Sequence, residues 1–541
     1  MIHKYITKQS SVLLPLIIAF SILSGCSQFI ELQPLDNLSE EVAFDTPGNI
    51  ELAINGVYRA ATIGEFEGGG GRGFPFGSAS IQQGEMRGED MINLQQSFTT
   101  TYEGAHSTVS VLNKNHWEQL YKMINEANVF IDGVRRAVEN GVIVAEVALA
   151  YEGEARFLRA LAHHELLLHF SRPFADDNGN KPGVPYRTVA ITSNGAIDNN
   201  VTVGRGTVAA AYENILVDLD FAEINLPNTR AVVGVSISRA TSGAAIALKT
   251  RIKLHQQDYS GVIAEANKLG AIGTSNFSSP IGAYTLSISP DEPFVNNGGN
   301  SESIFSFAMS GLANPGVTNS LSSTFGASTA NPDPGASGGR NQVSTSPILW
   351  NVSYWLEDDL RRTLLHFRQV NSDGGYRLVY NNKYRSFLIF SDWAPILRYA
   401  EVLLNASEAH ARLGNNAQSL SLLNAVRDRS VPNGASFGTT APEDLIQAVL
   451  NEQRIEFAGE GRRWPNIHRL ALDATYGTNG IPAKIEFASL DDQNSFDLAQ
   501  PPNISRNIVA LPYNSNLFLW PIPESEVLSN PTLAAEQNPG Y

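Results

Sequence analysis

The most chemically suggestive stretch of the sequence is HHELLLH, which contains His163, His164, Glu165 and His169. Zinc-binding helices with the H-E-x-x-H pattern place two histidines four residues apart, so that both face one metal ion. Here His164 and His169 are five residues apart, which separates them by about 140° around a helix of 3.6 residues per turn. We therefore predict ordinary helix-face histidines and no bound metal.

Other catalytic patterns are weak. The run GGGGRG at residues 68–73 lacks the Gly-Lys-Ser/Thr ending of a phosphate-binding loop, and no Gly-x-Ser-x-Gly elbow occurs. Acidic residues such as Asp358 and Asp359 could pair for glycoside hydrolysis. In a chain with 54 acidic residues, however, such pairs arise easily by chance. The sequence thus gives no positive sign of an enzyme, and we predict a protein without a cofactor.

The single cysteine, Cys26, follows a segment typical of an export signal. Lys4 and Lys8 supply positive charge, and residues 12–23 form an apolar core of signal-peptide length that is too short to span a bilayer. The sequence LSGC resembles the lipobox of bacterial lipoproteins, in which the cysteine is acylated once the signal is removed. We predict a signal peptide over residues 1–25 and a lipid anchor at Cys26, since two or more acyl chains give stable attachment.

Composition limits the function of the remaining chain. The formal net charge is −16, and residues 1–25 carry two lysines and no acid, so the mature chain is more negative still. Nucleic acid is excluded as a partner because its binding needs a basic face. No later apolar run approaches a membrane span, so contact with the membrane is expected through the lipid anchor only. One cysteine cannot build a disulfide framework, and the fold must depend on a hydrophobic core.

Hydrophobic periodicity predicts helices in the N-terminal part of the chain. Residues 117–134, 151–172 and 210–226 are amphipathic, and the second and third of these stretches are followed by Pro173 and Pro227, which stop a helix.

Two later stretches, residues 243–270 and 396–429, each break at a polar turn. They resemble the helix-turn-helix units of tetratricopeptide (TPR) repeats, in which small residues such as Ala245 and Ala406 let paired helices approach closely. We therefore expect two helical hairpins.

Between residues 270 and 395 the sequence is dominated by Gly, Ser, Asn and Pro, and residues 64–80 form a second such region. This composition predicts long irregular loops with a few short strands, such as one at SIFSFAM. The predicted fold class is therefore mainly α: a helical TPR-like scaffold of several helix-turn-helix units, with long irregular loops and a few short strands.

Six segments resemble the SusD/RagB family of outer-membrane nutrient-binding lipoproteins. They follow one another as AINGVYRA, WEQLYKMINEANVFID, EARFLRALAHHELLLHF, PILRYAEVLLNASEAHARLGN, LNEQRIEFAGEGRRWPNIHRL and LWPIPESEVLSNPTLAAEQNPGY. The resemblance implies a single SusD-like domain over residues 26–541. Within it, an N-terminal SusD-like part would reach about residue 230, and a C-terminal SusD/RagB part would begin at about residue 270.

The resemblance also implies a function. Family members are surface lipoproteins that cover a SusC-like TonB-dependent transporter of the outer membrane and capture nutrients for it. We therefore expect a lipid-anchored protein facing the cell exterior, with a glycan or oligosaccharide as its ligand. A peptide ligand is the alternative, and a surface hydrolase is a third possibility. The family's helical repeats face the transporter, which points to residues 240–270 and 396–430.

A glycan site needs exposed flat aromatic rings together with polar side chains. Aromatic residues inside helices are expected in the core, so aromatic residues in loops are the better candidates. Those near the glycine run and the long loop region are Phe74, Phe76, Tyr102, Trp350, Tyr354 and Trp355. For the last three the alternative is a helix, ILWNVSYWLEDDLRR, whose rings pack inward. The loops SNFSSPIGAY and SGLANPG are the next places to search.

Overall fold

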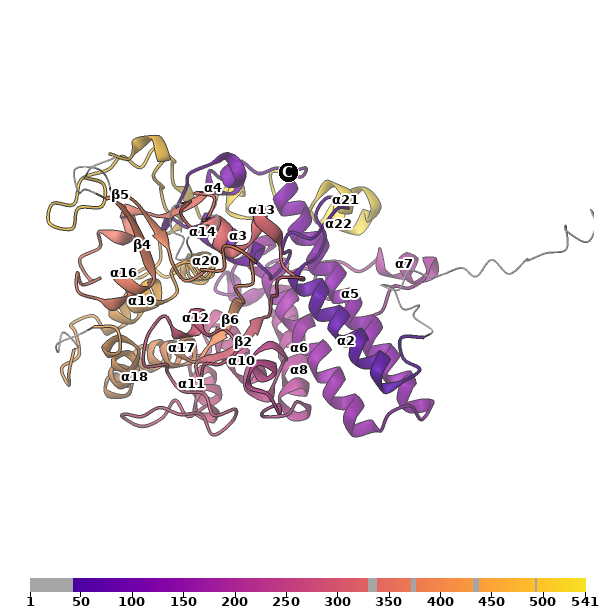
Figure 1. Ribbon diagram of the computed structural model, residues 1–541. Helices are drawn as coiled ribbons and strands as arrows, with labels where there is room; N and C mark the ends of the chain where they lie inside the picture. Colours follow the sequence, from indigo (N-terminus) through magenta and orange to yellow (C-terminus); the bar gives the residue numbers. More distant parts are fainter. Residues whose placement is uncertain (1–41, 329–337, 371–375, 432–436, 492–493) are drawn as a thin grey trace, which may run out of the picture.

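Helices dominate the computed structural model, which describes residues 42–328, 338–370, 376–431, 437–491 and 494–541 (Figure 1). The predicted signal peptide and Cys26 lie outside the described residues. The strands are short and pair two by two, so the predicted mainly α fold is confirmed. None of the helices in the described part of the chain combines the length and hydropathy needed to cross a membrane.

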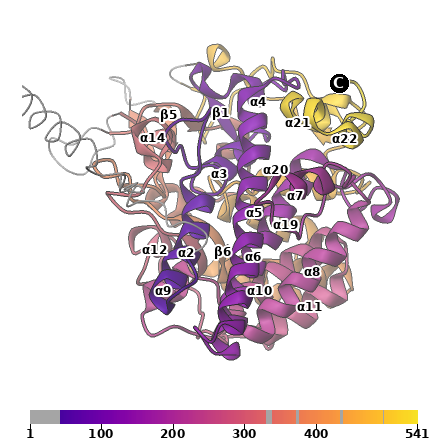
Figure 2. The same cartoon turned by 90° about the vertical axis from the view of Figure 1, so that its right-hand side faces the viewer.

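The N-terminal helices pack side by side in a layer, with α5 between α2 and α6, and α8 on the other side of α6 (Figures 1 and 2). The three predicted N-terminal helices are confirmed within α5, α6 and α8, and α6 ends at Phe170, shortly before Pro173. Because α6 is covered from both sides, almost every residue of its second half is buried. The helices of this part are α2 (Pro47–Thr62), α3 (Ala79–Met86), α4 (Thr99–Tyr102), α5 (Val111–Glu139), α6 (Ala145–Phe170), α7 (Asn194–Asn200), α8 (Val208–Asn225) and α9 (Val233–Ser238).

Two helical hairpins lie next to this layer, as the sequence predicted. The first consists of α10 (Ser242–His255) and α11 (Tyr259–Lys268), and the second of α17 (Tyr399–Arg412) and α18 (Asn416–Asp428). Asp258 begins α11 by accepting a hydrogen bond from the Gly261 N–H at 2.9 Å. Helix α17 contacts both α10 and α11, so hairpins far apart in sequence stack as in a TPR array.

Short elements connect these helices and carry the long loops. The predicted strand at SIFSFAM is confirmed as β2, which pairs antiparallel with β6 beside the hairpins. The strand pairs are β1 (Met91–Asn93) with β3 (Val343–Thr345), β2 (Ser303–Phe307) with β6 (Ala394–Arg398), β4 (His366–Val370) with β5 (Tyr376–Asn381), and β7 (Gly480–Ile481) with β8 (Leu511–Pro512). The remaining helices are α12 (Glu292–Val295), α13 (Gly316–Asn319), α14 (Leu321–Phe325), α15 (Pro347–Trp350), α16 (Leu360–Leu364), α19 (Leu445–Glu456), α20 (Arg463–Leu470), α21 (Glu524–Ser529) and α22 (Pro531–Ala535).

A continuous hydrophobic core runs from Ala43 to Leu533 and includes residues of both the N-terminal layer and the hairpins. Strand β2 lies at the junction: the ring of Phe305 packs edge-on against Phe157 of α6, with centroids 4.9 Å apart. On the same strand Phe307 stacks on Phe76 at 5.5 Å. Aromatic side chains of a short central strand therefore join segments that are far apart in sequence.

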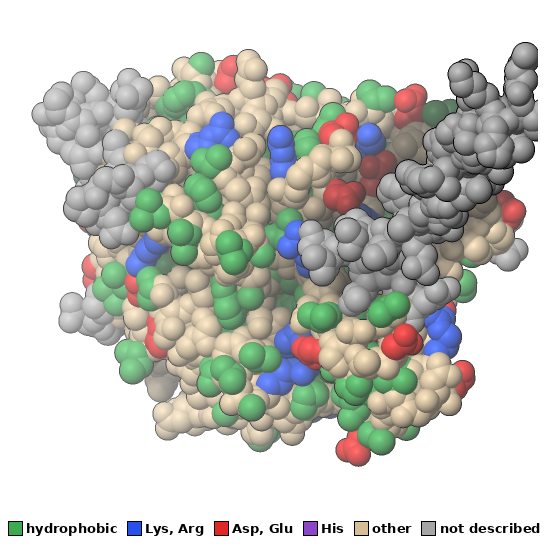
Figure 3. Space-filling view, turned by 45° about the vertical axis from the view of Figure 1, so that its right-hand side comes forward, with side chains coloured by type: hydrophobic (Ala, Val, Ile, Leu, Met, Phe, Trp, Pro, Cys, Tyr) green, Lys and Arg blue, Asp and Glu red, His purple; other side chains and the backbone are tan. Residues whose placement is uncertain are grey.

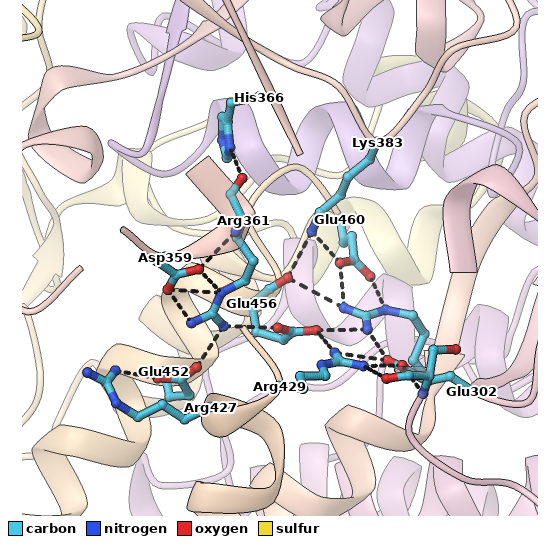
Figure 4. A network of polar contacts seen from close by, with 12 residues as sticks. Glu302, Asp359, Arg361, His366, Lys383, Arg427, Arg429, Glu452, Glu456 and Glu460 are labelled. Atoms are coloured by element: carbon cyan, nitrogen blue, oxygen red, sulfur yellow. Dashed lines mark hydrogen bonds and ion pairs between the residues drawn. The ribbon is translucent and has the colours of Figure 1, made fainter. Parts of the chain in front are cut away.

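A buried ion network holds the C-terminal part together (Figure 4). Arg398 of β6 lies at its centre and contacts Glu460 at 2.7 Å and Glu456 of α19 at 3.0 Å. Burial alone would raise the pKa of Glu456, but the surrounding guanidinium groups outweigh it and hold that pKa below its usual range. The network contains equal numbers of cations and carboxylates, namely Arg361, Lys383, Arg398, Arg427 and Arg429 with Glu302, Asp359, Glu452, Glu456 and Glu460.

The C-terminal segment, residues 520–541, closes over the end of α6. The backbone N–H of Trp520 donates to the carbonyl of His169 at 3.0 Å. Asn538 donates through Nδ2 to the carbonyls of Phe170 at 2.9 Å and Trp520 at 2.7 Å, and its Oδ1 accepts from Arg205 at 2.8 Å. Arg205 Nη2 also donates to the carbonyl of Phe170 at 2.8 Å, so the C-terminal segment and Arg205 together satisfy the buried backbone oxygens at the helix end.

Candidate functional site

The histidines of α6 point to different sides of the helix, as their spacing predicted. The ring of His164 lies 5.0 Å from that of His255 on α10. His169 instead faces Glu165, with Nε2 3.3 Å from the carboxylate Oε1. His164 and His169 therefore share no potential metal position.

A different trio of residues does come together. Nε2 of His116, from α5, also lies 3.3 Å from Glu165 Oε1, and the ligand atoms of His116, Glu165 and His169 all lie within 4.8 Å of one another. This cluster was not predicted from the sequence because His116 belongs to the preceding helix. Only the pairing of α5 with α6 brings it close to the other two side chains.

The donors around this trio do not favour a metal. Nη1 of Arg87 lies 3.0 Å from Nδ1 of His169. A guanidinium only donates hydrogen bonds, so Nδ1 must accept, and Nε2 carries the proton and points it at Glu165. Burial lowers the pKa of His169 to about 3, which keeps the ring neutral at pH 7. We interpret the cluster as a hydrogen-bonded part of the core.

Five of the six loop aromatics predicted to contact ligand are buried. Phe74 packs against the rings of Phe66 and His116, with centroids 5.6 and 6.1 Å away, and Phe76 stacks on Phe307. The hydroxyl of Tyr102 donates to the carbonyl of Ile485 at 2.8 Å. These rings present no free face in this structure, and their proposed contact with ligand stays a prediction.

The two tryptophans of the long loop region surround an arginine. Trp350 and Trp355 are 0% and 2% exposed, and the guanidinium of Arg362 lies 4.5 and 4.3 Å from their ring centroids. Their rings pack inward, as the alternative interpretation expected, although the segment is not one helix: it is helical at Pro347–Trp350 and again from Leu360 onward. Tyr354 is partly exposed, and its hydroxyl accepts a hydrogen bond from Arg454 at 3.3 Å.

Three loops meet at the surface near α3, α13 and α14. We call residues 64–75, 310–319 and 386–393 together the loop platform. Asn319 donates to the carbonyl of Arg72 and so joins the first loop to the second. Asn314 donates to the carbonyl of Ile389 at 3.2 Å and joins the second to the third. Gly73 lets the first loop approach the second closely, because a Cβ at this position would lie 2.8 Å from the side chain of Pro315.

The loop platform exposes both apolar and polar groups. Leu312, Leu388 and Ile389 are among the most exposed large hydrophobic residues, with exposed fractions of 101%, 58% and 55%. Phe66 is partly exposed, and the guanidinium of the exposed Arg72 lies 4.7 Å from its ring centroid. Phe390 and Trp393 are also partly exposed. Such a concentration of exposed apolar side chains is typical of a binding surface.

The loops of the platform were predicted from the sequence, whereas Phe66, Phe390 and Trp393 were not among the rings predicted to contact ligand. SGLANPG, the reserve candidate, supplies the most exposed hydrophobic residue, Leu312. In the glycine-rich loop, Phe66 stands between Glu65 and Glu67, whereas Phe74 and Phe76 lead directly into α3. Flanking charges were therefore the signal that could have selected the ring nearer to water.

The distribution of basic side chains bears on the expected absence of a nucleic-acid partner, which stays a prediction. On the face shown in Figure 3, Lys and Arg side chains stand apart from one another, and several have Asp or Glu as neighbours. Many described basic side chains also pair with carboxylates, as Lys122 does with Glu65 at 2.5 Å. An electrostatic footprint for nucleic acid would need clustered, unpaired cations.

Two protein-family models match separate parts of the chain. Residues 366–541 match a model described as the SusD family. Residues 73–254 match a model described as starch-binding associating with outer membrane. The first match covers most of the buried ion network and the C-terminal segment, and the second covers most of the N-terminal helical layer.

Individual proteins match over nearly the whole chain. SusD-like protein P2 of Formosa agariphila is 24% identical, over 96% of this chain and 97% of its own length. The crystal structure of a SusD superfamily protein from Bacteroides fragilis superposes with a TM-score of 0.71 at 24% identity, covering 90% of this chain and 99% of that one. A laminarin-binding SusD-like protein gives a TM-score of 0.67 at 20% identity, covering 92% and 100%. The family models, the relatives and the shared fold agree, and the chain belongs to the SusD/RagB family.

Proposed function

We propose that this protein captures a glycan or oligosaccharide at the loop platform and passes it to a SusC-like TonB-dependent transporter of the outer membrane. The observation that carries the proposal is the meeting of three loops in one exposed surface, which carries the partly exposed rings of Phe66, Phe390 and Trp393 and the exposed guanidinium of Arg72. Partly exposed rings can stack on sugar rings, and the guanidinium can bind hydroxyls. A similar protein is named for binding laminarin.

A peptide is the second candidate for the same surface. Leu312, Leu388 and Ile389 are aliphatic and strongly exposed, and aliphatic side chains suit peptide side chains better than they suit sugar rings. Neither candidate requires catalysis, and we propose a binding protein. A panel that contains both classes of ligand distinguishes between them.

Replacing Phe66 and Phe390 by alanine is expected to weaken glycan binding, because each stacking contact is worth about 0.5 to 1.5 kcal/mol. The expected loss is roughly two- to tenfold per ring, measured by isothermal titration calorimetry with laminarin and maltose oligosaccharides and with short peptides. Phe487→Ala, which removes an exposed ring outside the loop platform, should bind as the parent does.

The same titrations test the six rings chosen from the sequence. If Trp350→Ala or Trp355→Ala abolishes binding in a folded protein while Phe66→Ala and Phe390→Ala have no effect, the loop platform is the wrong site. If peptides bind and oligosaccharides do not, the second candidate replaces the first.

Cys26→Ala is expected to release the protein from the outer membrane, because acyl chains on this cysteine are its proposed anchor. We propose that the anchored protein faces the cell exterior. We also propose that residues 240–270 and 396–430 contact the transporter. Tethering makes this docking intramolecular and raises the effective concentration of the two partners. The measurement is fractionation with palmitate labelling, followed by copurification of the parent with a SusC-like barrel in mild detergent. A labelled, membrane-bound Cys26→Ala protein would contradict the anchor, and failure of the well-expressed parent to copurify would contradict the partner.

A further inference from the structure

A cavity of about 260 Å³ opens between α5, α7 and α21. It shares no lining residue with the loop platform, and it is reached from the side of the molecule where α7 and α21 lie in Figure 2. Asn125 and Asn128 of α5 fix its wall by hydrogen-bonding the backbone of residues 187–191. For example, Asn125 Oδ1 accepts from the Ile191 N–H at 2.8 Å. These hydrogen bonds therefore hold the wall of the cavity in place.

One end of the cavity is charged. Nη2 of Arg187 lies 3.5 Å from Oε1 of Glu526. The other contacts of this carboxylate are also long, at 3.3 Å from Trp117 Nε1 to Oε2 and 3.5 Å from Asn530 Nδ2 to Oε1. Good N–H···O hydrogen bonds are about 2.9 to 3.0 Å long. Glu526 therefore keeps the capacity to accept a shorter hydrogen bond, next to a guanidinium that can donate one.

Polar side chains of Asn125, Asn128, Asn200, Ser529 and Asn530 line part of the cavity, and the remaining wall is aliphatic. It consists of Ile124, Val189, Ile191, Ile197 and Val201, and Val189 and Ile197 remain 58% and 47% exposed. The wall contains one aromatic residue, Tyr121. Its ring is covered by Trp117 and Arg187, whose ring centroid and guanidinium lie 4.8 and 5.4 Å away. The exposed part of this wall is aliphatic and suits an apolar side chain better than a sugar ring.

We propose that this cavity binds a residue of an extended peptide whose aliphatic side chain enters between Ile124, Ile191 and Ile197. In an extended chain the N–H and C=O of one residue lie on the same edge, which is how antiparallel strands exchange pairs of hydrogen bonds. Glu526 accepts from the N–H and Arg187 donates to the C=O. The side chain leaves this edge roughly at right angles, which directs it toward the aliphatic wall.

Saturation-transfer NMR with trileucine tests the proposal, since this method detects weak ligands of a large protein. The expected result is transfer to the leucine methyl groups, and at least a tenfold loss of affinity in Ile197→Asp and in Glu526→Ala. Both side chains are partly exposed, so the variants should fold, and thermal unfolding verifies this. Leu528→Ser is the matched control, because Leu528 is an exposed residue of α21 that does not line the cavity.

Three outcomes would overturn the proposal. The first is no transfer to trileucine in the parent protein. The second is equal transfer in the parent and in Ile197→Asp. The third is equal or stronger binding of triserine or laminaritriose with the same dependence on Glu526, which would assign the cavity to a polar ligand. Because the loop platform is unaltered in these variants, glycan binding there should persist whatever the result.

Discussion

Replacing Arg398 with methionine is expected to lower the free energy of unfolding by about 3 to 5 kcal/mol, as is usual when one partner of a buried ion pair is removed. Arg398 is 2% exposed and contacts Glu302, Glu456 and Glu460. Without it the buried ion network holds one more carboxylate than cations. Methionine has a similar length but cannot satisfy these oxygens, so the cost comes from uncompensated buried charge.

The measurement for Arg398→Met is urea unfolding at pH 7, followed by circular dichroism. Lys181→Ala is the control, because Lys181 forms a surface pair with Asp176 at 3.8 Å, and such pairs contribute about 0 to 1 kcal/mol. A loss below about 1 kcal/mol in Arg398→Met would mean that the network does not stabilise the fold as its burial suggests.

Glu85→Gln is expected to remove a pH dependence of about 1.4 kcal/mol per pH unit from the stability of the protein. Glu85 of α3 is fully buried, its Oε1 accepts from the Gly461 N–H at 2.8 Å, and its Oε2 has no hydrogen-bond partner among the described residues. Burial, with the nearby charge of Asp90, raises the pKa of Glu85 to about 8. The folded protein therefore keeps this carboxyl protonated at neutral pH.

The sign of the effect follows from proton binding. The unfolded chain releases this proton near 4.5, the ordinary pKa of a glutamate side chain, and the folded chain releases it near 8. Between these values the folded state holds more protons, so its stability falls as pH rises. Glutamine mimics the protonated carboxyl, and the variant should gain on the parent by a few kcal/mol between pH 5 and 8.

Urea unfolding of the parent and of Glu85→Gln at pH 5, 6, 7 and 8 provides the test. Burial lowers the pKa of Lys484 to about 7, which adds a slope of opposite sign from about pH 7 upward, since the unfolded lysine keeps its proton to higher pH. This slope is common to both proteins and cancels in their difference. Glu139→Gln, at an exposed position, is the control. A pH-independent difference between parent and Glu85→Gln would show that Glu85 is ionised in the folded protein.

The helices were predictable because each carries its own signal. The apolar residues of α5 recur at helical spacing through Trp117, Leu120, Ile124 and Ile131, and all four are buried. The hairpin turn before α11 likewise carries its own cap, Asp258. Local hydrogen bonds and one-sided burial determine these elements, and both are written in consecutive residues.

The site was less predictable because exposure depends on how the chain folds back on itself, over short as well as long separations. Trp350 and Trp355 look like loop aromatics until Arg362 and His366 are folded around them. The ion network was missed for the same reason: Arg398 and Glu302 are 96 residues apart. Charge pairing across such separations follows from the packing of helices and leaves no periodic signal in the sequence.

The closure of the C-terminal segment over α6 has a consequence for how the chain reaches its folded state. Asn538 bonds to Phe170, which is 368 positions earlier in the sequence. Glu536 bonds to Arg205, which is 331 positions earlier. During synthesis the carbonyls at the end of α6 lack these partners until residues 520–541 have been made. Contacts of such high contact order form late. The N-terminal helices thus stay incompletely closed until this segment packs against them.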